Sequence, residues 1–204
     1  MLRPKAHAVF ILYQKPDFSA SQTAYICAHK SYTLVRNNKA RPESESKPFK
    51  HLLVEESVVE DIEERAETLF NELWCNGDRK LFSETIEVLE YFKRNGYKIG
   101  VISDTSPSLE FTLQQLGIAK YFTSFTASSL VGAGKPSPII FNAALSAQGV
   151  TAEESLYVDD YKPEADGARQ QGFTSFLIDR NQRYNDEWTI NDLRQLIEYV
   201  EKQN

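Results

Sequence analysis

The chain has 204 residues, of which 41% are hydrophobic and 25% charged, a composition typical of a globular protein with one full domain and room for an insertion. Its net charge of −6, from 23 basic and 29 acidic residues, argues against nucleic acid as a partner. Two cysteines are too few for a disulfide framework, and no apolar run approaches the length of a membrane span. We therefore expect a cytoplasmic protein without a membrane partner, and nothing in the sequence predicts an oligomeric state.

The first part of the chain combines one expected strand with helical and polar segments. His7–Tyr13 is a short apolar run ended by Gln-Lys-Pro, and it predicts a buried first strand. Apolar residues at helical spacing predict helices at Phe18–Val35 and at Val54–Cys75. The polar stretch Asn37–Lys50, which contains two prolines, is expected to form a loop.

From Ser83 onward, expected strands and helices alternate with short connections. The expected strands are Tyr97–Ser103, Tyr121–Ala127, Leu156–Val158 and Thr174–Ile178. The expected helices begin after Ser83 as an N-cap, at Pro107, at Ile139, before Ala165 and at Ile190. This alternation predicts an α/β fold, a three-layer Rossmann-like parallel sheet with right-handed crossovers. Residues 1–17 and 82–204 would form this core, and residues 18–81 a small helical cap inserted after the first strand.

Polar side chains follow three of the expected strands. They lie in Ser103-Asp104-Thr105, in Gly134-Lys135-Pro136 and in the acid pair Asp159-Asp160. The carboxyl ends of parallel strands share one edge of the sheet, so we expect these loops to converge there. A hydroxyl, an ammonium and paired carboxylates suit a phosphoryl group beside Mg²⁺, because the first two bind phosphate oxygens and the carboxylates hold the metal. Singly, each has a plainer interpretation: Asp159 or Ser103 as a helix cap, and Lys135 as a solvated loop residue.

These three stretches resemble motifs of the haloacid dehalogenase (HAD) superfamily, whose members are mostly phosphatases. VISDTS resembles the second motif, with Ser103 in the phosphate-binding position, and GAGKPSPIIF resembles the third, with Lys135 as its lysine. YVDDYKPEADGARQQGF resembles the fourth, with Asp159 and Glu164 as its two acids and the adjacent Asp160 as an alternative. The resemblance implies a Mg²⁺-dependent hydrolase of the HAD-like fold that acts on a small phosphorylated metabolite, with Mg²⁺ held among these acids.

The first motif departs from the family pattern, which is Asp-x-Asp-x-Thr or Asp-x-Tyr-Gly-Thr directly after the first strand. Here Ile11 stands in the position of the nucleophilic Asp, Tyr13 in that of the second acid, and Lys15 in that of Thr. Isoleucine neither attacks phosphorus nor binds a metal. Asp17, several residues further on, is a poor replacement because a nucleophile must be placed to within about an ångström.

Two explanations fit this departure. The chain is either a genuine relative that keeps the phosphate-binding edge without the nucleophile, or its first stretch is altered by a coding error, and re-reading the encoding DNA separates the two. The sequence therefore favours a phosphatase-like hydrolase that is weak or inactive as written. The alternative is a non-catalytic module on the same fold that binds a phosphorylated ligand or a protein.

Overall fold

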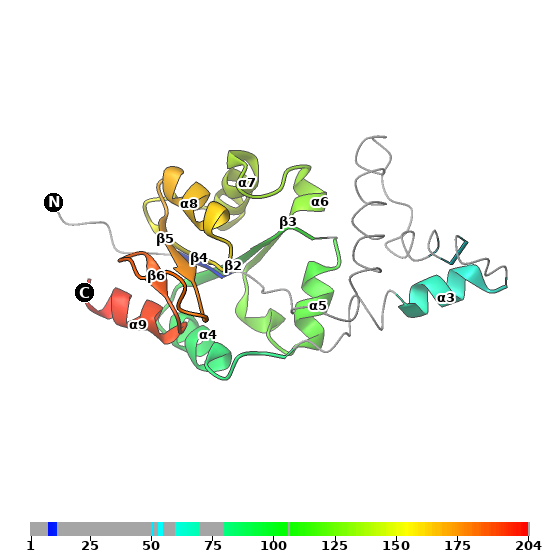
Figure 1. Cartoon of the computed structure of the whole chain (residues 1–204), viewed down its shortest axis with the longest axis horizontal. Coiled ribbons are helices and arrows are strands. Elements are labelled where there is room, and N and C mark those ends of the chain that lie inside the picture. Colours follow the sequence, from blue (N-terminus) through cyan, green and yellow to red (C-terminus); the bar gives the residue numbers. More distant parts are fainter. Residues whose placement is uncertain are drawn as a thin grey trace. The chain divides into compact units, whose positions relative to one another are not determined.

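The computed structural model of the chain describes residues 8–11, 50, 53–54, 60–69, 80–105 and 107–203, with residues 8–11 described by their backbone (Figure 1). The chain divides into two compact units, one formed by Met1–Gln14 with Lys80–Asn204 and the other by Lys15–Arg79. The predicted helix Phe18–Val35 lies outside the described residues, as does the predicted loop Asn37–Lys50 apart from its last residue. The role of residues 18–81 as a cap stays a prediction.

The larger unit is built on a six-stranded sheet in the order β3-β2-β1-β4-β5-β6, in which every neighbouring pair is parallel. The strands are β1 Ala8–Ile11, β2 Lys98–Ser103, β3 Ser124–Ala127, β4 Ser155–Asp159, β5 Thr174–Ile178 and β6 Thr189–Ile190. The predicted α/β fold with a parallel sheet is confirmed. The sequence interpretation missed β6, which was expected to be the start of the last helix, because two residues are too short to show a period.

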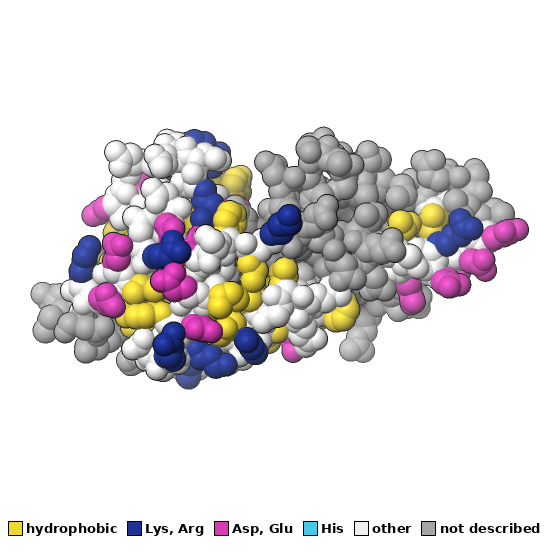
Figure 2. Space-filling model, turned by 90° about the horizontal axis from the view of Figure 1, so that it is seen from below, with side chains coloured by type: hydrophobic (Ala, Val, Ile, Leu, Met, Phe, Trp, Pro, Cys, Tyr) yellow, Lys and Arg dark blue, Asp and Glu magenta, His cyan; other side chains and the backbone are white. Residues whose placement is uncertain are grey.

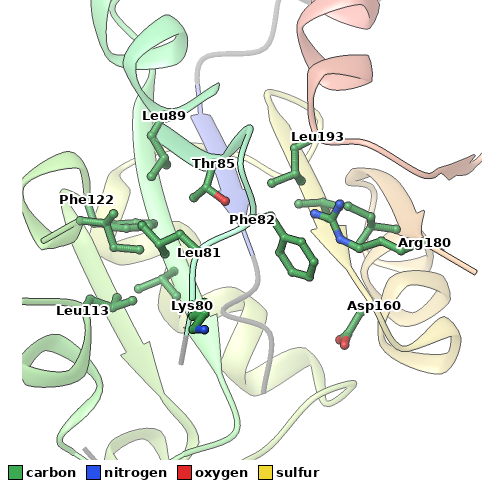
Figure 3. A pocket seen from close by; sticks show the side chains of 14 residues that line it. Lys80, Leu81, Phe82, Thr85, Leu89, Leu113, Phe122, Asp160, Arg180 and Leu193 are labelled. Carbon is green, nitrogen blue, oxygen red and sulfur yellow. The ribbon is translucent and has the colours of Figure 1, made fainter. Parts of the chain in front are cut away.

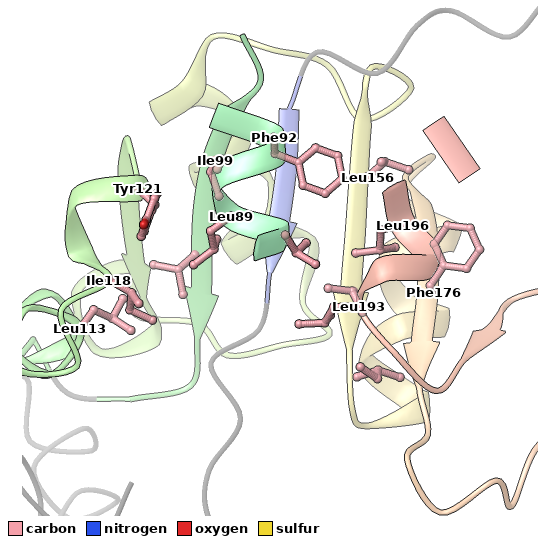
Figure 4. Close-up of a cluster of buried hydrophobic side chains, with 14 of the residues drawn as sticks. Leu89, Phe92, Ile99, Leu113, Ile118, Tyr121, Leu156, Phe176, Leu193 and Leu196 are labelled. Carbon is pink, nitrogen blue, oxygen red and sulfur yellow. The ribbon is translucent and has the colours of Figure 1, made fainter. Parts of the chain in front are cut away.

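Helices cover both faces of this sheet (Figure 1). On one face lie α4 Thr85–Arg94, α5 Leu109–Gln115 and α9 Arg194–Glu201, and on the other α6 Ser128–Val131, α7 Pro138–Gln148 and α8 Lys162–Gln170. A short 3-10 helix, Ala119–Tyr121, precedes β3. Side chains of a strand alternate between the faces, so Leu156 and Val158 pack in one hydrophobic cluster and Tyr157 in the other. Figure 4 shows the first cluster, where Leu89 and Phe92 of α4 lie against the strands.

Capping residues explain where α7 begins and ends, whereas the cap that the sequence predicted for α4 is wrong. Ser137 accepts a hydrogen bond from the backbone N–H of Ile139, Pro138 occupies the first turn, and α7 ends at Gly149 with a φ of 63°. Ser83 was expected to cap α4 in the same way. The N-cap residue is instead Glu84, whose side chain makes no capping bond, because it turns to form an ion pair with Arg180.

In the smaller unit the predicted single helix Val54–Cys75 is wrong. Residues 53–54 are helical, but Glu60 and Asp61 form a bend, and α3 then runs over Ile62–Leu69. Asp61 has a φ of 51°, in the left-handed region, which a right-handed helix cannot continue through. Residues 70–75 lie outside the described part. None of the helices within the described ranges is long and apolar enough to cross a membrane.

Candidate functional site

A buried lysine joins two carboxylates at the carboxyl edge of the sheet. Lys135 lies in the loop between α6 and α7, and its Nζ is 2.9 Å from Oδ2 of Asp159, the last residue of β4. The same Nζ is 2.5 Å from Oε2 of Glu164, in the first turn of α8. The side chains of Lys135 and Asp159 are 2% and 0% exposed, while that of Glu164 is 16% exposed. One ammonium group thus joins the lysine loop to the end of β4 and to the first turn of α8.

Asp159 is held by further hydrogen bonds. The hydroxyl of Tyr157 donates to Oδ2 at 2.5 Å, and the backbone N–H of Tyr161 donates to Oδ1 at 2.9 Å. Tyr157 is itself fixed by an edge-to-face contact with Phe141, at 5.5 Å between ring centroids. Burial, together with the charge of Asp159, holds the pKa of the Tyr157 hydroxyl well above its ordinary value, so this group stays a donor.

The lysine loop is fixed through its backbone as well. The N–H of Lys135 donates to Oδ1 of Asp104, the residue after β2, at 3.0 Å and to its Oδ2 at 3.2 Å. The loop packs directly on α8 at Gly167, where a Cβ atom would lie 2.4 Å from Cβ of Pro136. Only a glycine permits this approach, which brings Lys135 within reach of Glu164.

The charges in this network are unequal, since the ammonium of Lys135 contacts the carboxyl groups of both Asp159 and Glu164, and the backbone of Lys135 contacts a third carboxyl group, that of Asp104. Burial alone would lower the pKa of Lys135, but the attraction of Asp159 and Glu164 outweighs it and raises the pKa above its ordinary value. Burial raises the pKa of Glu164 to about 7, the attraction of Lys135 opposes this rise, and the charge of Asp159 adds to it. The lysine is therefore charged at neutral pH, while Glu164 exchanges a proton in the neutral range.

The other predicted site residues are placed as follows. Ser103 ends β2 and is buried, next to Asp104. The half-buried Asp160 does not share the surroundings of Asp159, because it lines a cavity with Phe82 and Arg180 (Figure 3). The backbone of Ile11 ends β1 opposite Val158 of β4. Tyr13 lies outside the described residues.

Two residues of the network were not assigned a role from the sequence. Asp104 was seen only as a neighbour of Ser103, although an acid directly after a strand is a signal for a loop anchor. In the sequence Tyr157 belongs to an apolar run, yet its separation of two residues from Asp159 places both on one face of β4. Among the described residues, no group of three or more His, Cys, Asp and Glu side chains is arranged to hold a metal ion.

The model of the haloacid dehalogenase-like hydrolase family matches residues 6–172, which are most of the chain. The chain therefore belongs to the haloacid dehalogenase-like hydrolase family. It is 33% identical over 153 residues to a phosphoserine phosphatase of Thermus thermophilus, a match that covers 72% of this chain and 61% of that protein. It is 28% identical over 127 residues to an (S)-2-haloacid dehalogenase of a Pseudomonas species, covering 59% of this chain and 55% of that protein.

The matched part of the chain spans between 50% and 61% of the first curated relatives, so their activities are not carried over directly. Solved structures agree in fold. A HAD phosphatase from Thermococcus onnurineus superimposes with a TM-score of 0.60 at 22% identity, with 95% of this chain and 97% of that chain covered. A putative HAD-hydrolase from Bacillus subtilis, bound to magnesium, gives a TM-score of 0.62 at 13% identity, covering 96% and 99%. At these identities the likeness concerns the fold alone.

Proposed function

We propose that this chain binds a small phosphorylated molecule at the edge formed by Ser103, Lys135 and Asp159, and that it hydrolyses the phosphate ester weakly or not at all. The observation that carries the proposal is the buried contact of Lys135 with Asp159 and Glu164, maintained beside a first strand without a carboxylate. The relatives support the phosphoryl class of ligand, since phosphoserine, phosphoglycolate and glyceraldehyde 3-phosphate phosphatases are among them.

The missing nucleophile is the second half of the proposal. Residues 1–16 contain no Asp or Glu, and the first carboxylate of the chain is Asp17. Ile11, the last residue of β1, pairs with Val158 of β4, and Leu12 follows it in the sequence. Whichever of the two stands in the position of the nucleophile, it is a hydrocarbon. Hydrolysis through an aspartyl-phosphate therefore has no attacking group at this strand end.

Mg²⁺ is part of the proposal because the network carries more negative than positive groups. Carboxylate oxygens are the ligands this ion prefers, and it is commonly bound by one or two carboxylates together with water and phosphate. Asp159 and Glu164 would hold it, whereas Asp160, the alternative that the sequence offered, lines the cavity with Arg180 instead. When bound, the ion supplies the positive charge that lets a phosphate dianion approach this acidic edge.

The residues of the chain itself would do the remaining work. The ammonium of Lys135 and the hydroxyl of Ser103 would bind phosphoryl oxygens, and Asp104 would keep the lysine loop in place. Tyr157 would hold Asp159 in one orientation through its hydroxyl. Together these groups bind and orient a phosphate, but they offer no nucleophile.

The test is to return a carboxylate to the first strand. With p-nitrophenyl phosphate and Mg²⁺, the unmodified protein should stay near the background rate. Ile11→Asp or Leu12→Asp should raise turnover, incompletely because Tyr13 stands in the position of the acid that protonates the leaving group. Ile11→Asn and Leu12→Asn are the matched controls, since each adds a polar group of the same size without a nucleophile. Mg²⁺-dependent turnover by the unmodified protein that is lost in Asp159→Asn would refute the proposal.

A further inference from the structure

A cavity lies against the face of the sheet that α4 and α9 cover, and all of its lining residues belong to the larger unit. Its volume is 80 Å³, several times the space of about 10–15 Å³ that one water needs. Most of its wall is apolar and comes from the strands and the covering helices (Figure 3). The most deeply buried part of this wall, at most 4% exposed, is formed by Leu89, Val101, Leu113, Ile118 and Val158.

The cavity extends from this buried wall to the surface of the molecule. Two further lining residues, Lys80 and Phe82, are exposed, and the exposed fraction of Phe82 is 41%. Viewed from the side of α4 and α9, hydrophobic side chains reach the surface among charged ones (Figure 2). A small molecule can therefore reach the apolar wall from the solvent.

The charged groups beside Phe82 carry both signs. Figure 3 shows Arg180 and Asp160 at this end of the cavity. Nη2 of Arg180 is 2.7 Å from Oε1 of Glu84, and the carbon at the centre of its guanidinium lies 3.5 Å from the centroid of the Phe82 ring. The guanidinium is therefore already paired, and a carboxylate in the cavity would meet the like charge of Asp160. An ammonium group would in turn meet the like charge of Arg180, so this end favours a ligand without charge.

One uncharged polar group of the lining is available to a ligand, the hydroxyl of Thr85. Thr85 is the first residue of α4 and is half-buried. Figure 3 shows its oxygen among the lining side chains, between Leu89 and Phe82. The backbone N–H of Thr85 donates to the carbonyl oxygen of Phe82, but its hydroxyl makes no hydrogen bond to another of the described residues. Because a hydroxyl both donates and accepts, it suits an alcohol or a carbonyl group.

We propose that the cavity binds a small neutral molecule with a compact hydrocarbon body and one hydroxyl or carbonyl group, independently of the phosphate-binding edge. The body would lie against Val101 and Leu113, where it is removed from water, and the oxygen would form a hydrogen bond with the hydroxyl of Thr85. An apolar cavity of about 150 Å³ binds benzene. The volume of 80 Å³ therefore limits the body to about three to five carbon atoms.

The probe is 3-methyl-1-butanol, titrated into the full chain and followed by amide NMR. The expected result is a set of saturable shifts in α4 and β2, with a Kd of about 1–10 mM. The ions 3-methylbutanoate and 3-methylbutylammonium carry a hydrocarbon body of the same shape with a charge, and each should bind at least about tenfold more weakly. Saturating inorganic phosphate should leave the binding of the alcohol unchanged. Equal binding of either ion, displacement by phosphate, or the absence of saturable shifts would overturn the proposal.

Two pairs of variants locate the probe. Thr85→Val keeps the volume but removes the hydroxyl, and should weaken the binding of 3-methyl-1-butanol about three- to tenfold. Thr151→Val, at an exposed threonine outside the lining, should leave binding unchanged. Val101→Ile adds a methyl group to the wall and should weaken binding at least about fivefold, whereas Val131→Ile in α6 should not. The thermal unfolding of each variant checks that it is folded. Unchanged binding in a folded Thr85→Val or Val101→Ile variant would contradict the proposed site.

Discussion

Replacing Lys135 by methionine tests the electrostatic core of the site, because methionine keeps most of the apolar stem and removes only the charge. Asp159 is 0% exposed and has the ammonium 2.9 Å away, and Glu164 lies 2.5 Å from the same nitrogen. Breaking a buried pair from one side costs about 3–5 kcal/mol, since the remaining charge has neither water nor a counter-ion. We therefore expect Lys135→Met to lose about 3–5 kcal/mol of unfolding free energy at pH 8.

The assay is urea unfolding, supported by thermal melts in which the midpoint should fall by about 6–20 °C for a chain of this size. The matched control is Lys162→Met. Lys162 pairs with Asp166 at a similar distance, 2.7 Å, but both side chains are more than a third exposed, so its loss should cost about 1 kcal/mol or less. The difference between the variants should narrow at pH 4, where the acids left without Lys135 can protonate. A Lys135→Met variant within about 1 kcal/mol of the unmodified protein at pH 8 would refute this reasoning.

Two further predictions concern the same network. Gly167→Ala should lower the free energy of unfolding, measured in urea, by about 1–3 kcal/mol, because the new Cβ would lie 2.4 Å from Cβ of Pro136. This loss should exceed the gain from the better helix propensity of alanine. An unchanged free energy of unfolding would mean that the lysine loop moves freely. The pKa of Glu164 is raised to about 7 in the folded state. Between pH 4.5 and 7 the folded state therefore binds more protons than the unfolded state. The contribution of Glu164 to the free energy of unfolding should fall as the pH rises through that window. Glu164→Gln should remove this dependence, and an identical pH profile of the variant would contradict the assignment.

The sheet could be predicted from the sequence because buried parallel strands are continuous apolar runs. β5 has the predicted bounds, Thr174–Ile178, and β2 differs from its predicted bounds by one residue. The meeting of Lys135 with Asp159 and Glu164 followed from topology, since the loops after parallel strands share one edge.

Other features depend on contacts that no local pattern reports. The sequence could not show that Glu84 would turn to Arg180 and leave Ser83 without a capping role, because the two partners are far apart in the chain. The apolar spacing of Val54–Cys75 is helical throughout, so the left-handed Asp61 was not foreseen. The sequence alone could not show which of the adjacent acids Asp159 and Asp160 contacts the lysine. In the fold, Asp159 binds Lys135 and Asp160 lines the cavity.

The central claim is that the site binds a phosphate ester and does not cleave it, and ³¹P NMR tests both halves in one sample. p-Nitrophenyl phosphate, Mg²⁺ and the unmodified protein are combined and followed over time. The account predicts a saturable broadening of the ester resonance, absent with Lys135→Met, and no growth of the inorganic phosphate resonance above background. Growth of inorganic phosphate that requires Mg²⁺ and Asp159, or an ester resonance that the protein leaves unchanged, would contradict it.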